Sequence, residues 1–214
     1  MTTTATAIAP PPGDQHLLHD DVSWAFYEHL LAEIGDRPFR VTFDDGSLEV
    51  MSPLRTHEKW KKRIARLIEM LSLELDITMA TLGSTTFRRK DRGKGLEPDD
   101  CYYIQHAAAV EGKDELDLTV DPPPDLAIEI DITHRSIPRK PIYAALGVPE
   151  VWRFDARRLT VLLLGPDGTY SAAAASLAFP FLPMAKFESF LLRLASEPQN
   201  AVLREFRDWV KALR

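Results

Sequence analysis

The sequence predicts an α/β protein in which helices flank a mixed β-sheet, and three patterns indicate this. Apolar residues alternate on both sides of Asp45-Gly46, as in a β-hairpin. Apolar residues also recur at helical spacing from about His57 to Leu75. Short apolar runs that read as strands lie near 99–105, 126–131, 150–154 and 159–164. Together with a crossover helix after residue 131, these strands favour a mixed sheet with helices packed on it.

The N-terminal part divides into an arm and the start of a domain. Residues Met1 to about Gln15 are rich in Thr, Ala and Pro, and we expect a disordered arm there. Residues 16–214 are expected to form a single domain. Its first helix is predicted to begin after the capping residue Ser23 and to end at Gly35.

In the rest of the chain, glycine and proline residues mark the ends of the predicted helices and strands. Residues 78–90 predict one or two strands, and residues 91–96, with two glycines, predict a loop. A polar excursion covers 106–124, and the crossover helix is expected to end at Gly147. A turn is predicted at 166–168, and two helices are predicted at 185–194 and 200–213.

Composition excludes several classes of protein. The single cysteine, Cys101, excludes an internal disulfide framework and a cysteine-based zinc site, and it suits a cytoplasmic location. The net charge of −6 argues against a nonspecific polybasic binder of nucleic acid. We find no apolar run long enough for a bilayer, no signal peptide and no glycine-rich loop for a nucleotide cofactor.

Two proline-flanked acidic segments carry the candidate chemistry. The first is Glu97-Pro98-Asp99-Asp100, and the second runs from Pro124 to Asp131. Asp99 and Glu129 each stand at the edge of a predicted strand, where an acid can point out of the core. Two carboxylates with substrate phosphate oxygens suffice for Mg²⁺, and a nearby cation can stabilise charge on a phosphoryl group. The sequence therefore favours a metal-dependent phosphodiester nuclease.

Each acid also has a structural interpretation. Asp99 could cap a turn after Pro98. Glu129 lies within an apolar strand, where an acid is costly unless it is paired or metal-bound, and an ion pair with Arg139 or Lys140 is the main alternative. Asp125 shares a strand face with Glu129 and is a further metal-ligand candidate.

Three further features are secondary. Glu49 in the hairpin and His57 at the helix start are additional site candidates, although a lone histidine there is more often a surface or capping residue. The basic side chains of the long helix form either a solvated face or a phosphate contact surface. They are Lys59, Lys61, Lys62, Arg63 and Arg66.

Other chemistries fit less well. Gly83-Ser84-Thr85-Thr86 lacks the nucleophile-elbow pattern. Paired acids also serve glycoside hydrolysis, but no stretch of the sequence signals the long aromatic-lined cleft that it needs.

At these acidic segments the chain resembles the Uma-type restriction endonuclease family, a branch of the PD-(D/E)XK nuclease superfamily. The resemblance covers about Phe39 to Leu164. It is carried by 45–53 with His57, by 83–86, by 97–99, by 124–129, and by Tyr143 with 147–153.

The resemblance implies a restriction-endonuclease-like core, DNA as substrate and Mg²⁺ or Mn²⁺ held by Asp99 and Glu129. It also implies a homodimer, because two sites are needed to cut both strands. The lysine expected two residues after the second acid is replaced by Asp131, and the family's later lysine position, four residues before Tyr143, holds Arg139 with Lys140 beside it. An arginine cannot readily deprotonate a water.

Two hypotheses follow from the sequence. In the first, the chain is a magnesium-dependent DNA endonuclease in which Asp99 and Glu129 bind metal and Arg139 or Lys140 stabilises the transition state. Asp125, Glu49 and His57 assist. In the second, the chain is a catalytically inactive relative that binds DNA or a protein partner.

Overall fold

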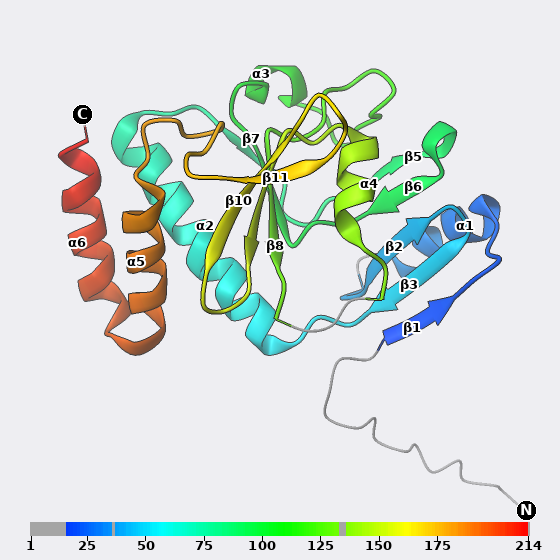
Figure 1. Cartoon of the computed structure of the whole chain (residues 1–214), viewed down its shortest axis with the longest axis horizontal. Coiled ribbons are helices and arrows are strands. Elements are labelled where there is room, and N and C mark those ends of the chain that lie inside the picture. Colours follow the sequence, from blue (N-terminus) through cyan, green and yellow to red (C-terminus); the bar gives the residue numbers. More distant parts are fainter. Residues whose placement is uncertain (1–15, 36, 133–135, 214) are drawn as a thin grey trace, which may run out of the picture.

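The computed structural model describes residues 16–35, 37–132 and 136–213. It contains two β-sheets with helices packed on them (Figure 1). A six-stranded mixed sheet lies between α2, α5 and α6 on one side and α4 on the other. This confirms the predicted fold class. The expected arm at Met1 to Gln15 falls outside the described residues.

The six-stranded sheet contains the predicted core strands. Their order is β11 (Tyr170–Ala173), β10 (Leu159–Leu164), β9 (Glu150–Phe154), β8 (Leu126–Ile130), β7 (Asp100–Tyr103) and β4 (Ala80–Thr81). The β8–β9 pair is parallel, and the other pairs are antiparallel. The parallel pair needs a crossover, and α4 (Arg139–Leu146) supplies it before ending at Gly147. Strand β11 was not predicted.

The second sheet is antiparallel and was not anticipated as a separate layer. Its order is β1 (His16–His19), β3 (Ser47–Met51), β2 (Arg40–Asp44), β6 (Lys94–Leu96) and β5 (Phe87–Arg89). The predicted hairpin is β2–β3, and positive φ angles at Asp45 and Gly46 match its tight turn.

The predicted loop at 91–96 is wrong in its second half. A short 3₁₀ turn, η1 (Lys90–Arg92), leads into β6, which pairs with β2 and β5. Gly95 signalled a loop, but a β-carbon there would collide with the Tyr27 phenol. The glycine therefore permits close packing of a strand against α1.

The helices follow the predicted pattern closely. Helix α1 (Trp24–Ile34) begins after Ser23, whose hydroxyl accepts a hydrogen bond from the Phe26 amide. Helix α2 (Arg55–Leu75) begins two residues before the predicted start. The other helices are α3 (Ala107–Val110), α5 (Met184–Ser196) and α6 (Gln199–Lys211).

Strand β8 divides the interior and so positions the site. Leu126, Ile128 and Ile130 belong to the core shared with α2, α5 and α6. Ala127 belongs to the core shared with α4. Because successive side chains of a strand point to opposite faces, Glu129 lies on the α4 side. Glu129 therefore meets the first turns of α4 rather than the long basic helix.

Candidate active site

Asp99 directly precedes β7 and is bound to β8, the neighbouring strand that carries Glu129. The β7–β8 register ends at the pair Asp100–Ile128, one residue short of both acids. The Asp99 amide donates to the Ile128 carbonyl at 3.1 Å, and the Ile130 amide donates to Asp99 Oδ2 at 2.7 Å. The Asp99 carboxylate thus continues the hydrogen-bond ladder. Asp99 and Glu129 are therefore at the same end of the β7–β8 pair.

Helix α4 holds the Glu129 carboxylate from one side. Tyr143 Oη donates a hydrogen bond to Glu129 Oε1, and Arg139 Nε lies 3.2 Å from the same oxygen. Residues four apart share a helix face, so both side chains reach the strand together. All three residues are buried, and the ion pair offsets the cost of burying the acid. The Glu129–Arg139 ion pair that the sequence left open is present.

Arg139 retains unused hydrogen-bonding capacity. Its Nη2 donates to the Glu97 carbonyl oxygen. Within the described part of the chain, its Nη1 is buried and has no hydrogen-bond acceptor. A buried guanidinium with an unused donor can accept an anionic oxygen as a partner.

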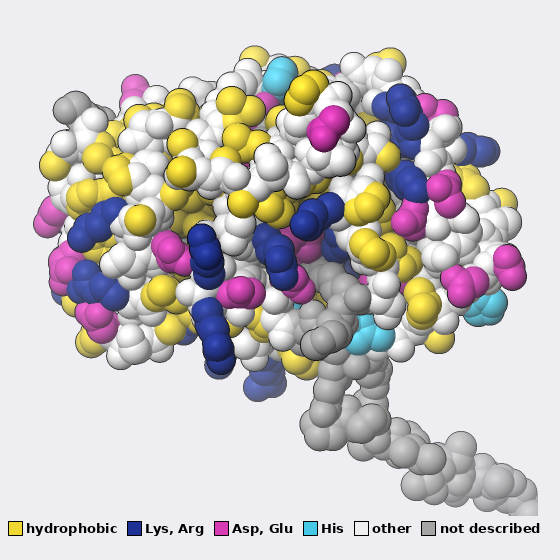
Figure 2. Space-filling model, in the orientation of Figure 1, with side chains coloured by type: hydrophobic (Ala, Val, Ile, Leu, Met, Phe, Trp, Pro, Cys, Tyr) yellow, Lys and Arg dark blue, Asp and Glu magenta, His cyan; other side chains and the backbone are white. Residues whose placement is uncertain are grey.

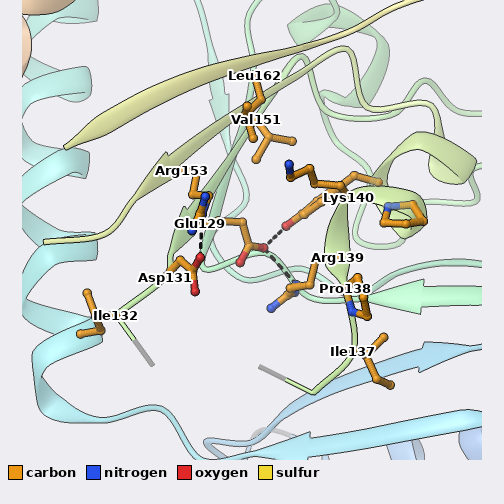
Figure 3. A pocket seen from close by; sticks show the side chains of 12 residues that line it. Glu129, Asp131, Ile132, Ile137, Pro138, Arg139, Lys140, Val151, Arg153 and Leu162 are labelled. Atoms are coloured by element: carbon orange, nitrogen blue, oxygen red, sulfur yellow. Dashed lines mark hydrogen bonds and ion pairs between the residues drawn. The ribbon is translucent and has the colours of Figure 1, made fainter. Parts of the chain in front are cut away.

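A pocket of about 770 Å³ opens beside Glu129, between α4 and strands β8 to β10 (Figure 3). Lys140 is exposed and lines it, whereas its neighbour Arg139 is buried. Arg153 also lines the pocket and binds Asp131 at 2.6 Å. Figure 2 shows Lys and Arg side chains gathered near the middle of this face, beside acidic and hydrophobic ones. The pocket thus offers cations next to Glu129.

Asp125 lies away from the paired acids. It precedes Glu129 by four residues, which in a strand is about 13 Å. Its carboxylate accepts hydrogen bonds from the Ile104 and His106 amides at 2.6 and 3.0 Å and contacts the His106 ring. These contacts fasten the turn after β7. The structure therefore does not bring Asp125 together with Asp99 and Glu129.

Glu49 and His57 are both buried and lie on neighbouring elements. Glu49 Oε1 accepts a hydrogen bond from the Ser136 amide at 2.8 Å, which ties β3 to the segment that leads into α4. His57 Nδ1 accepts one from the Leu54 amide at 3.2 Å, at the start of α2. Glu49 therefore fixes the segment before α4, and His57 fixes the start of α2.

Asp100 points to the opposite face from Asp99. It accepts hydrogen bonds from Tyr102 Oη at 2.8 Å and from the Cys101 amide at 3.0 Å. Burial raises the pKa of the Asp100 carboxyl above its usual range. Asp100 lines a second groove, of about 450 Å³, with Lys61 and other basic residues of α2. The alternation of β7 therefore separates the two acids of the Asp99-Asp100 pair.

Two residues near the site had no assigned role in the sequence. Tyr143 was part of the family resemblance. Its position four residues after Arg139 was the feature of the sequence that could have placed it beside Arg139 in the site. Glu97 is buried, accepts from Thr86 Oγ1 at 3.1 Å and pairs with Arg40 at 3.3 Å. Burial raises the pKa of the Glu97 carboxyl, and Arg40 opposes the shift. No local pattern distinguished Glu97 from an exposed acid beside a proline.

The donor set fits a hard divalent cation. Among residues 16–35, 37–132 and 136–213, no group of three or more His, Cys, Asp or Glu side chains could hold a metal. Mg²⁺, however, commonly uses one or two carboxylates and completes its shell with water and substrate phosphate. Asp99 and Glu129 are two carboxylates at the same end of the β7–β8 pair and are candidates for this role.

The mixed sheet and its helices define a protein with a restriction-endonuclease-like fold. The chain belongs to the Uma2 family, described as "Putative restriction endonuclease", whose model matches residues 24–191. This confirms the family that the sequence resembled. A search of curated proteins gives no match. No helix in the described ranges is long and apolar enough to cross a membrane.

Proposed function

We propose that this protein is a metal-dependent endonuclease that hydrolyses DNA phosphodiester bonds. Asp99 and Glu129 hold Mg²⁺ or Mn²⁺. The observation that carries the proposal is that these two buried acids lie at the same end of the β7–β8 pair, where Glu129 lines a pocket together with Lys140. Membership of a nuclease family supports the same chemistry.

The side chains around Asp99 and Glu129 have separate roles in this proposal. A bound divalent ion would polarise the phosphoryl oxygen and lower the pKa of the attacking water. Tyr143 and Arg139 fix the orientation of Glu129 through Oε1. Lys140, exposed in the pocket, binds the phosphate and stabilises its developing charge. Arg139 Nη1 offers a second donor to the same group.

Neighbouring elements support the site and the substrate. Glu49 and His57 fix the segments before α4 and α2, and Asp125 fixes the turn after β7. The basic residues of α2 contact DNA phosphates along the second groove. We further propose that the protein is cytoplasmic and forms a homodimer, which brings two sites together.

Cleavage of plasmid DNA and of single-stranded DNA in the presence of Mg²⁺ or Mn²⁺ tests the proposal. Asp99→Asn and Glu129→Gln keep side-chain size and remove charge, and each should abolish cleavage. Asp208→Asn, which changes an exposed acid on α6, is the matched control and should cleave normally. Cleavage that persists in both site variants, or that the native protein lacks across metals and substrates, contradicts the proposal.

One observation favours a second function, that of a catalytically inactive DNA- or protein-binding module. Arg139 occupies the family's lysine position, and its guanidinium is already paired with Glu129. If this pair replaces a metal, the native protein will bind no divalent ion but will still bind its partner.

A further inference from the structure

The pocket beside Glu129 is larger than a metal ion and a phosphate require. Its volume is about 770 Å³. A divalent ion with about six waters fills roughly 200 Å³, at about 30 Å³ for each water. The remaining space lies within the range of sites that hold an organic ligand. A bulky part of the substrate therefore has room next to the reacting phosphate.

The lining of the pocket combines apolar and charged side chains. Val151 and Leu162 line it from strands β9 and β10, Ile132 lines it just after β8, and Ile137 lines it just before α4 (Figure 3). Lys140 and Arg153 bring cations to the same cavity. This combination suits a ligand with a flat, weakly polar body and an attached anion, which is the chemistry of a nucleotide.

We propose that the pocket accepts one unpaired nucleobase next to the scissile phosphate, so that the substrate is single-stranded DNA. This inference rests on the proposed nuclease function. In a duplex, each base is stacked and paired, and it can enter a cavity only after it is flipped out at an energetic cost. An unpaired strand does not bear that cost.

Binding to three ligands of equal length tests this inference. They are single-stranded oligothymidine, an abasic strand that keeps every phosphate, and a duplex. With EDTA present, fluorescence anisotropy should show oligothymidine bound at least about fivefold more tightly than the abasic strand, because the contacts of one base are worth about 1–3 kcal/mol. The duplex should also bind more weakly than oligothymidine.

Filling the pocket provides the matching test on the protein. Leu162→Trp should abolish the preference for oligothymidine over the abasic strand. Leu73→Trp makes the same change at an exposed position on α2 and should keep the preference. Ile132→Glu adds a charge to the pocket lining at a half-buried position. It should also abolish the preference for oligothymidine, and it provides the test if Leu162→Trp folds poorly.

The outcomes separate this inference from the nuclease proposal. Equal binding of oligothymidine and the abasic strand, or tighter binding of the duplex, overturns the pocket assignment. Metal-dependent cleavage of the duplex would then still support the nuclease. If no oligonucleotide binds, both the pocket assignment and the choice of DNA as substrate are wrong.

Discussion

Asp99 and Glu129 lie at the same end of the β7–β8 pair, and Asp99 Oδ2 accepts a hydrogen bond from the Ile130 amide at 2.7 Å. The acid that precedes β7 is therefore fixed by the backbone of the strand that carries the second acid. Four measurements on the surrounding residues test this arrangement.

Replacing Glu129 with Gln should destabilise the protein as well as remove a ligand. The change leaves the Arg139 guanidinium buried without its counter-charge. Breaking a buried pair in this way costs about 3 kcal/mol of unfolding free energy. Urea unfolding measures the loss. A variant as stable as the native protein would mean that the pair contributes little in solution.

Tyr143→Phe removes one hydroxyl and keeps the buried ring. It should lower the unfolding free energy by about 1–2 kcal/mol, because a hydrogen bond to a carboxylate is lost. It should also weaken metal binding, since Glu129 is less well oriented. Tyr102→Phe is the control, because Tyr102 donates to Asp100 on the other face. Equal effects of both variants on metal affinity would contradict the role of Tyr143.

Lys140→Met should lower the cleavage rate by roughly 100-fold, the usual loss when one charge-stabilising donor is removed. Stability should not change, because Lys140 is exposed. Single-turnover cleavage and thermal unfolding measure the two quantities. Lys211→Met, on α6, controls for the loss of a positive charge. An unaffected cleavage rate would mean that Lys140 does not stabilise the phosphoryl charge and that Arg139 alone supplies the cation.

Stability should depend on pH through Asp100. Burial raises its folded pKa above the unfolded value, so the folded state binds its proton more tightly. This contribution is fully present below the unfolded pKa and is lost as pH rises through the folded pKa. Asp100→Asn does not titrate, so its stability relative to the native protein should increase with pH. Metal-free urea titrations at several pH values check this, and a constant or decreasing difference would contradict it.

The sequence predicted the elements whose signals are local. The Asp45-Gly46 turn, the apolar stripe of α2 and the Gly147 end of α4 all appear as expected. Strand β6 was missed because its pairing with β2 joins segments about 50 residues apart, and Gly95 conceals it locally. Separation of the strands into two sheets also depends on long-range pairing.

The site residues also divide into those that local patterns predicted and those whose positions depend on long-range packing. Alternation along β8 placed Glu129 on a face, and the family resemblance paired it with Asp99. The shared face of Asp125 and Glu129 suggested proximity, but alternation does not measure distance along a strand. The division between a buried Arg139 and an exposed Lys140 depends on how α4 docks, which no local pattern encodes.

The central claim is that Asp99 and Glu129 together bind a divalent metal ion. Calorimetric titration of the native protein with Mn²⁺ tests it most directly, alongside Asp99→Asn and Asp208→Asn. We predict one site per chain in the native protein and in Asp208→Asn, and no binding in Asp99→Asn. Absence of binding in the native protein, or unchanged binding in a folded Asp99→Asn variant, would contradict the account.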